Sequence, residues 1–257
     1  MYLLDVRAYL EWSPDMSQSK QALIRTLEFR DELNDAERSA LSQLSGRKAK
    51  YSKGEEIVAE GSKPTESCLM TAGFSARSQF LMEGTRQFTA LHIPGDFVDL
   101  HSFTLKVMDH SVVAVSDCET LFVAHSRLQG IVEEFPHLGR LLWLLTTVDG
   151  AIQRAWITCL GRRSSSGHLA HLLCEIYVRQ EVAGLARDNV FDFPVTQAEL
   201  ADFLGLSVVH VNRTLRDLRS AGYIAWQGNM VTILDPEGLK AHAEFDPTYL
   251  NLVNLRR

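Results

Sequence analysis

Residues 196–215 read TQAELADFLGLSVVHVNRTL, which is two short amphipathic segments separated by a glycine. Ala201 stands four residues before Gly205, and Val211 follows six residues after it. At this spacing a small residue lets two helices cross closely, the glycine supplies backbone freedom for the turn, and an apolar residue fills the angle between them. The stretch therefore predicts a helix-turn-helix whose second helix covers 207–219.

Polar residues at both helix starts support this prediction. Thr196 and Glu199 have the spacing of a capping box, and Ser207 is a favourable N-cap for the second helix. In a helix-turn-helix the second helix enters the major groove N-terminus first, so its exposed early residues meet base edges and phosphates. The predicted DNA-binding residues are Thr196, Gln197, Ser207, Val208, Val209, His210, Asn212 and Arg213.

Side-chain chemistry gives some of these residues individual roles. Val208 and Val209 suit thymine methyl groups, Asn212 can pair with adenine, and Arg213 can contact guanine or a phosphate. An alternative for Arg213 is a salt bridge with Asp217, and an alternative for the whole stretch is a purely structural helical hairpin. Three arginines oppose one aspartate over 207–220, which makes a local positive patch on a chain of net charge −6.

The flanking sequence predicts the rest of a winged helix. A helix starts at HLAHLLCEIYVRQE (168–181), a loop follows at GLARDNVFDFPV (184–195), and YIAWQGNMVTIL (223–234) reads as a hairpin turning at Gly228 and Asn229. The short polar stretch RRSSSG (162–167) is predicted to be a linker.

A long helix is predicted over 136–161. One apolar stripe, interrupted by Asp149, is expected to pack within the chain and contains Leu138, Leu142, Leu145, Ile152, Trp156 and Cys159. A helix of this length has more apolar surface than one partner covers, which predicts a homodimer. The face expected to pair with the same helix of a second subunit contains Leu141, Leu144, Val148 and Ala155.

The residue pattern of the N-terminal half changes near residue 47 from helical to β-rich. Short β-rich runs over 47–127 are punctuated by glycines about every ten residues, which is typical of an antiparallel sandwich or roll. Asn34 and Asp35 mark a helix start before it. The predicted fold class is α+β, with these parts: N-terminal helices (1–46), an effector-type β-roll resembling a jelly roll (47–135), a dimerisation helix (136–161), a winged helix (162–240) and a C-terminal tail (241–257).

Composition excludes several other classes. The cysteines Cys68, Cys118, Cys159 and Cys174 have no CxxC spacing, so we expect free buried thiols rather than a zinc or iron–sulfur site. The run LLWLL (141–145) is too short to span a bilayer, which predicts a cytoplasmic protein without membrane contact. No glycine-rich phosphate loop, metal triad or nucleophile motif is visible, so an enzyme is not expected.

Three stretches carry a resemblance to a known family: IPGDFVDLHSF (93–103), LGRRSSSGHLAHLL (160–173) and TQAELADFLGLSVVHVNRTLRDLRSAGYI (196–224). They resemble the Crp/Fnr family of bacterial transcription regulators over about residues 35–245. This resemblance implies a cyclic-nucleotide-binding-type β-roll, a homodimer, palindromic DNA as partner and RNA polymerase as a further candidate partner. Familiar members carry an Arg-Glu pair where this chain has Val208 and Val209, so the DNA target is expected to differ.

The same resemblance predicts where an effector would bind. Aligned from PGDF, this chain has Leu100 where cyclic-AMP-binding members have a ribose-binding glutamate, and His110-Ser111 where they have a phosphate-binding Arg-Ser pair. A leucine cannot accept a hydrogen bond, and a neutral histidine does not replace a bidentate arginine. Control by cyclic AMP is therefore not expected. The predicted effector pocket contains Asp99, Leu100, His101, His110, Ser111, Gln153 and Arg154.

Other cofactors of the family fit no better. His101 stands where the family's carbon monoxide sensor has a haem-ligating histidine, but Asp99 replaces the nearby cysteine and no second ligand is visible. An iron–sulfur cluster is not expected, since no cysteine precedes residue 68. The cofactor stays unknown, with two alternatives open: another small molecule in the same cavity, or no ligand. In the cavity His101, His110 and Arg154 could form an anion site, or Asp99 and Asp109 could pair with the histidines.

Two classes of function remain. The first is a sequence-specific DNA-binding transcription regulator that acts as a homodimer. The second is a ligand-binding regulatory module that acts through a protein partner, with the winged helix as the interaction surface. The two differ in whether Asn212 and Arg213 are needed.

Overall fold

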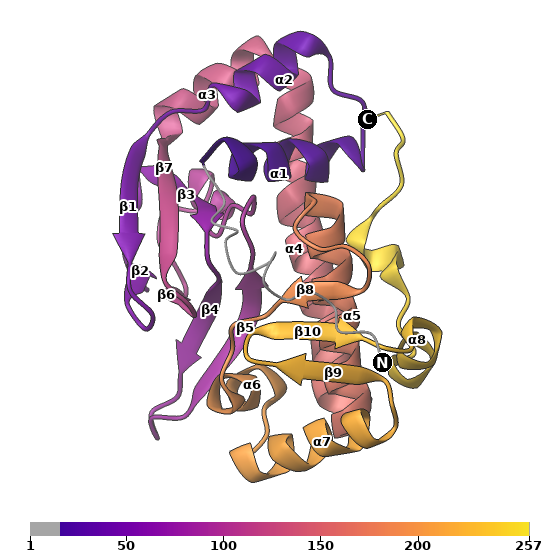
Figure 1. Cartoon of the computed structure of the whole chain (residues 1–257). Helices are drawn as coiled ribbons and strands as arrows, with labels where there is room; N and C mark the ends of the chain where they lie inside the picture. The colour runs from indigo at the N-terminus through magenta and orange to yellow at the C-terminus, as the bar shows by residue number, and fades with distance from the viewer. Residues whose placement is uncertain (1–15, 257) are drawn as a thin grey trace.

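A computed structural model describes residues 16–256 of the chain. Figure 1 shows a β-roll on one side, a long helix running through the molecule and a winged helix at the lower end. The predicted α+β class is therefore confirmed. The elements are α1 (Met16–Glu28), α2 (Asp35–Ser42), β1 (Arg47–Tyr51), β2 (Glu56–Val58), β3 (Glu66–Ala72), β4 (Ser75–Phe80), β5 (Arg86–His92), η2 (Leu100–Phe103), β6 (Ser111–Ala114), β7 (Cys118–Ala124), α3 (His125–Glu134), α4 (Pro136–Arg162), α5 (Ser165–Ala183), β8 (Val190–Asp192), α6 (Gln197–Leu204), α7 (Val208–Ser220), β9 (Ile224–Gln227), β10 (Met230–Ile233), α8 (Pro236–Ala243) and η3 (Pro247–Leu250).

The β-roll consists of two antiparallel sheets, with strand orders β1-β7-β3 and β2-β6-β4-β5. The chain passes from the first sheet to the second at Gly73, which has a φ of +76°. A Cβ there would lie 2.1 Å from the carbonyl oxygen of Asp117, so only glycine fits this turn. Apolar side chains from both sheets, such as Met70 and Val112, are buried between them.

Helices α1 and α2 cover one end of the β-roll (Figure 1). The predicted start of α2 is confirmed, since Asn34 and Glu37 form a capping box. The C-terminal residues return to α1, where the Arg30 guanidinium donates to the Leu250 carbonyl at 3.0 Å and Asn254 donates to the Glu28 carbonyl at 2.8 Å. The predicted tail is thus held against the N-terminal helices, while the sequence-based assignment of residues 1–15 lies outside the described part.

Helix α4 begins at Pro136, a residue favoured in a first helical turn, and ends at Arg162. The expected inward stripe is confirmed at five of its six positions, and Leu145 is half-buried. The predicted dimer face is wrong, because Leu141 and Val148 are buried within their own chain and Leu144 packs against both adjoining apolar cores. The large apolar residues that α4 leaves exposed are Trp143 at 73%, Ile157 at 67% and Leu160 at 47%.

Two local predictions also need correction. The stretch 162–167 is not a linker of six residues, because α4 continues to Arg162 and α5 begins at Ser165. The Ser164 hydroxyl accepts a hydrogen bond from the Gly167 N–H, so this serine caps a helix instead of lengthening a loop. The predicted loop 184–195 contains strand β8, which pairs with β10.

The C-terminal part forms a three-stranded sheet of order β8-β10-β9 with α5, α6, α7 and α8 around it. The predicted hairpin is confirmed, with Met230 paired to Gln227 and Gly228 at a φ of +56°. Its apolar core is continuous with that of the β-roll and α4. In particular, the Phe203 ring of α6 lies 4.7 Å from Phe88 of β5 and 5.9 Å from Trp156 of α4, between ring centroids.

Ion pairs join the same two halves. Arg86 of β5 pairs with Asp202 of α6 at 2.5 Å, and Lys53 pairs with Glu199 at 2.9 Å. The helix-turn-helix is therefore packed directly on the β-roll through α6.

The remaining predictions from composition concern thiols and membranes. The four cysteines are free and buried, as expected. Within residues 16–256, no helix has both the length and the apolar character that a membrane span requires.

Candidate nucleic-acid interface and ligand cavity

The crossing of α6 and α7 has the geometry predicted from the sequence. Gly205 ends α6 in the left-handed region, with a φ of +63°. Ala201 and Val211 are both buried where the two helices meet, and Val211 is fully inaccessible. These three residues fix the angle between the helices, which confirms the helix-turn-helix.

Hydrogen bonds at the helix starts fix the two ends. The Thr196 hydroxyl accepts from the Glu199 N–H at 3.2 Å, and the Glu199 carboxylate accepts from the Thr196 N–H at 2.7 Å. The Ser207 hydroxyl accepts from the His210 N–H at 3.3 Å, so α7 begins where predicted. Thr196 and Gln197 are exposed at the start of α6.

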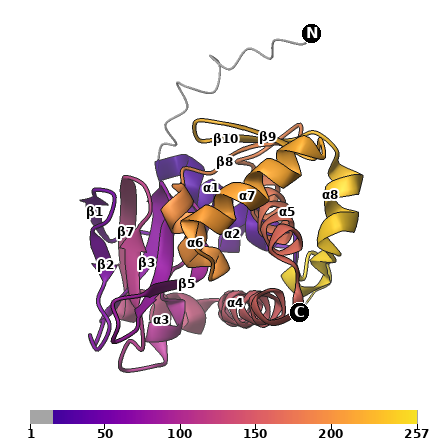
Figure 2. The ribbon, with the colours of Figure 1, turned by 90° about the horizontal axis from the view of Figure 1, so that it is seen from below.

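The first two turns of α7 form an open surface at the lower end of the molecule, and α7 lies in front when the molecule is seen from below (Figure 2). Val209 is 71% exposed and Val208 is 42% exposed. His210 and Arg213 are exposed beside them. Burying these apolar side chains against another molecule would be favourable, because it removes apolar surface from water. This surface therefore suits an intermolecular contact.

Asn212 and Arg213 differ in exposure and in the contacts that their side chains make within the chain. Asn212 is half-buried, and its amide donates to the Val208 carbonyl at 3.1 Å. One amide hydrogen and the side-chain oxygen remain for a base. Over the described residues no ion pair joins Arg213 to Asp217, so the alternative of a salt bridge at this position is not seen.

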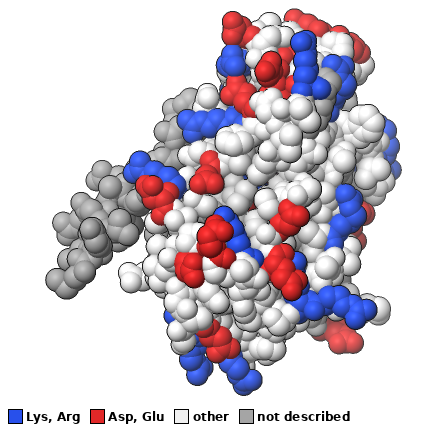
Figure 3. All heavy atoms as spheres, turned by 90° about the vertical axis from the view of Figure 1, so that its right-hand side faces the viewer, with Lys and Arg blue, Asp and Glu red and all other residues white. Residues whose placement is uncertain are grey.

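The charges of this region are mixed. Arg213, Arg216 and Arg219 are exposed on α7, together with Asp217. Figure 3 shows acidic and basic side chains interspersed over the right-hand face of Figure 1, without a broad area of one sign. Because the whole chain has a net charge of −6, the arginines of α7 are the local positive patch that can attract a polyanion.

A second candidate site is a cavity of about 440 Å³ between the β-roll and α4. Strands β4 and β5, the segment 101–110 and one side of α4 form its wall. It is lined by Arg77, Gln79, Phe88, Thr89, His101, Leu105, Asp109, His110, Thr146, Asp149, Gly150, Gln153, Trp156, Ile157 and Leu160. Two of these, Phe88 and Trp156, also contact Phe203 of the helix-turn-helix.

Three residues predicted for the effector pocket line this cavity: His101, His110 and Gln153. The other four lie elsewhere, and their assignment is corrected. Asp99 and Leu100 are buried beneath the segment, where the Asp99 carboxylate accepts from the Cys68 N–H at 2.6 Å. Ser111 donates to the Glu56 carboxylate at 2.6 Å, and Arg154 is exposed outside the lining. The resemblance to the family placed the segment 99–111 beside the cavity, but the sequence alone does not show which of its side chains face the cavity.

Sequence reasoning missed Arg77, the buried cation of the cavity. Its Nε donates to His110 Nε2 at 2.9 Å, and its Nη1 pairs with Asp149 of α4 at 3.1 Å. This explains why Asp149 interrupts the apolar stripe of α4. The available signal was a lone arginine within the β-rich run SCLMTAGFSARSQFL (67–81).

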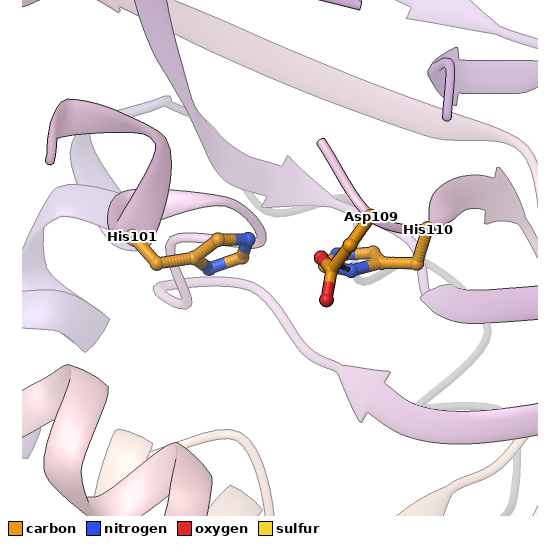
Figure 4. A group of neighbouring side chains, drawn as sticks. All are labelled: His101, Asp109 and His110. Carbon is orange, nitrogen blue, oxygen red and sulfur yellow. Dashed lines mark hydrogen bonds and ion pairs between the residues drawn. The ribbon is translucent and has the colours of Figure 1, made fainter. Parts of the chain in front are cut away.

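His101, Asp109 and His110 lie together on the wall of the cavity (Figure 4). His110 Nδ1 lies 2.7 Å from the Asp109 carboxylate, and its Nε2 accepts from Arg77, so its proton is on Nδ1. Burial lowers the pKa of His110 to about 4, with Arg77 adding to the effect. Burial, followed by Arg77, also lowers the pKa of His101. Both imidazoles are therefore neutral at pH 7.

Of the two aspartates expected to pair with the cavity histidines, only Asp109 does so. Asp109 pairs with His110, whereas Asp99 bonds to backbone. Burial raises the pKa of Asp99 to about 7, although the bond from the Cys68 N–H opposes the shift.

Comparisons with known proteins agree with this architecture. Residues 48–135 match the family described as cyclic nucleotide-binding domain, and residues 167–242 match the Crp-like helix-turn-helix domain. A probable transcriptional activator of Rhizobium leguminosarum bv. viciae is 32% identical over 177 residues, which is 68% of this chain and 72% of that protein. The transcriptional activator protein FnrL of Cereibacter sphaeroides is 28% identical over 187 residues, covering 72% of this chain and 75% of FnrL.

A solved structure shows the same fold. The structure of FixK2 from Bradyrhizobium japonicum superposes with a TM-score of 0.69 at 24% identity. The match covers 77% of this chain and 97% of the FixK2 chain.

Proposed function

Because this chain belongs to the Crp/Fnr family and is a DNA-binding transcription regulator, we propose that it reads a palindromic site as a homodimer through α7. The observation that carries the proposal is the exposed surface of Val208, Val209, His210 and Arg213 on α7. Helix α7 is held at its base by buried Val211, so these side chains can enter a major groove without disturbing the core.

The proposed reading of bases follows from the chemistry of this surface. The two valines pack against thymine methyl groups, and Arg213 forms a bidentate contact with guanine. Asn212 retains one donor and one acceptor for adenine. Thr196, Gln197 and Ser207 at the helix starts are placed for phosphate contacts. We propose that the absence of an Arg-Glu pair at 208–209 gives a DNA target unlike that of the familiar family members.

The proposed dimer interface is a different face of α4 from the one first predicted. Trp143, Gly150 and Ile157 recur at intervals of seven residues, and Leu160 follows Ile157 by three. Trp143, Ile157 and Leu160 are exposed and Gly150 is half-buried, and apolar residues at this spacing form the seam of a two-stranded coiled coil. Gly150, Ile157 and Leu160 also line the cavity, so a second subunit would cover its open side.

We propose that the cavity responds to a ligand other than cyclic AMP. Its buried cation, Arg77, already bonds His110 and Asp149, and is therefore not free to hold a cyclic phosphate. The ribose-binding position is Leu100, which is buried away from the cavity. Contacts from Phe88 and Trp156 to Phe203 offer a direct route from a ligand to the helix-turn-helix.

The proposal places the protein in the cytoplasm, where it meets DNA and RNA polymerase, and gives it no enzymatic role. The test is selection of genomic DNA fragments by the purified protein, followed by footprinting. We expect salt-sensitive binding and two protected half-sites about 34 Å apart, one helical turn. Retention of random fragments as strongly as genomic ones would contradict the proposal, as would normal regulation in cells by a variant with both Asn212 and Arg213 replaced by alanine.

A further inference from the structure

Folding brings together a set of metal-ligating side chains that no spacing in the sequence reveals. His101 comes from η2, while Asp109 and His110 come from the loop before β6. One ligand atom from each lies within 4.8 Å of the other two. Figure 4 shows the His101 ring directed toward the Asp109 and His110 side chains. We propose that this cluster binds a divalent transition-metal ion of the zinc class.

The donor set decides the class of ion. Two imidazoles with one carboxylate suit zinc, iron, cobalt or nickel, whereas magnesium and calcium prefer oxygen ligands alone. With bonds of about 2.1 Å, tetrahedral ligands lie about 3.4 Å apart. The most distant pair of ligand atoms therefore needs to approach by about 1.4 Å at most, while His110 Nδ1 and the Asp109 carboxylate oxygen, now 2.7 Å apart, need to separate by about 0.7 Å. The Asp109 side chain is 75% exposed and can turn to do so.

Two further observations point to a ligand at this place. The Nε2 atom of His101 is buried without a hydrogen-bond partner among the described residues. The cluster also lies on the wall of the cavity, which gives an ion a path from solvent. Among the described residues, the charged groups that act on His101 are Arg77, Asp149 and Asp109, and Arg77 is already paired with Asp149, so the Asp109 carboxylate leaves a negative charge that favours a cation.

Binding of the ion would change the contacts of Arg77. As the metal bonds to His110 Nδ1, the proton on that nitrogen moves to Nε2, which then becomes a donor. It faces the Nε–H of Arg77, also a donor, so the 2.9 Å hydrogen bond between them is lost. Arg77 keeps Asp149 of α4 as its partner. The ion thus alters the link between the β-roll and α4, and its role as a signal rests on the proposed function.

The test measures metal binding without DNA. Full-length protein, stripped with a chelator, is titrated with Zn²⁺ by calorimetry and with Co²⁺ by visible absorption. We expect one ion per chain, and at least about tenfold weaker binding in His101→Gln and in Asp109→Asn. His242→Gln is the control, since His242 is exposed on α8 and bonds Ser166. Absence of binding, or equal affinity in wild type and both variants, would overturn the site.

A second measurement separates this inference from the proposed function. DNA binding is measured with and without Zn²⁺ for wild type and His101→Gln. Protein that binds DNA but not Zn²⁺ or Co²⁺ overturns the metal site alone. Protein that binds one ion per chain, with the expected loss in both variants, but selects no DNA supports the metal site and contradicts the proposed function alone.

Discussion

Replacement of Ile157 tests the dimer, because this side chain is 67% exposed in the single chain and belongs to the proposed seam on α4. Burying a whole isoleucine side chain stabilises by about 1.5–3 kcal/mol, so burying two thirds of it is worth about 1–2 kcal/mol. The dimer buries it twice, which amounts to about 2–4 kcal/mol. At about 1.4 kcal/mol per tenfold change, Ile157→Ala should raise the dimer dissociation constant roughly 30- to 700-fold.

The assay is sedimentation velocity over a range of concentrations, which separates the 28.9 kDa chain from its dimer. Leu234→Ala is the matched control, since Leu234 is 57% exposed but lies after β10, away from α4. It should leave the dissociation constant unchanged. A wild type that stays monomeric at high concentration, or an Ile157→Ala variant that dimerises as tightly as wild type, would refute the coiled-coil seam.

Two further predictions concern stability. Gly205→Ala and Gly222→Ala both force alanine into the left-handed region, at φ values of +63° and +78°, and each should cost about 1–2 kcal/mol in urea unfolding. Gly205→Ala should cost more, because its Cβ would lie 3.2 Å from Leu160 whereas Gly222 has open space; equal costs would contradict this packing. Burial, followed by Arg163, lowers the pKa of His168 and of His171 to about 4, below the unfolded value of about 6.5. The unfolded chain then binds more protons between pH 6.5 and 4, so the free energy of unfolding should fall by roughly 3 kcal/mol per histidine as pH drops through this window. Asp99, with its raised pKa, offsets part of this loss because its stabilising contribution grows as pH falls. The double variant His168→Gln, His171→Gln should lose less stability than wild type between pH 6.5 and 4, although not none, because burial also lowers the pKa of His110 to about 4. An equal fall in the free energy of unfolding of both proteins would contradict the assignment.

Local features were predictable from the sequence. The capping box at Thr196, the cap at Ser207 and the turn at Gly205 depend on neighbours within a few residues, so their pattern is visible in a single sequence. The same holds for the hairpin at Gly228 and for the cap of α2 at Asn34. These elements form in the structure where they were predicted.

Features set by long-range packing were not predictable in the same way. Helix α4 has apolar residues on several sides near Leu141 and Leu144, so periodicity alone could not tell which side its own chain covers. Likewise, alignment of the segment 99–111 placed it beside the cavity but could not give the direction of each side chain. Arg77 was missed because its partners, His110 and Asp149, are 33 and 72 residues away in the chain.

Sequence recognition by α7 is tested by comparing the base preference of wild type with that of Arg213→Ala. Arg127→Ala is the control, since it removes the same charge from an exposed position on α3. In competition binding against every single-base variant of the selected site, Arg213→Ala should lose about 1–3 kcal/mol at the base it contacts, or roughly 5- to 150-fold. Arg127→Ala should keep the wild-type preference. An unchanged base preference in Arg213→Ala would contradict the account.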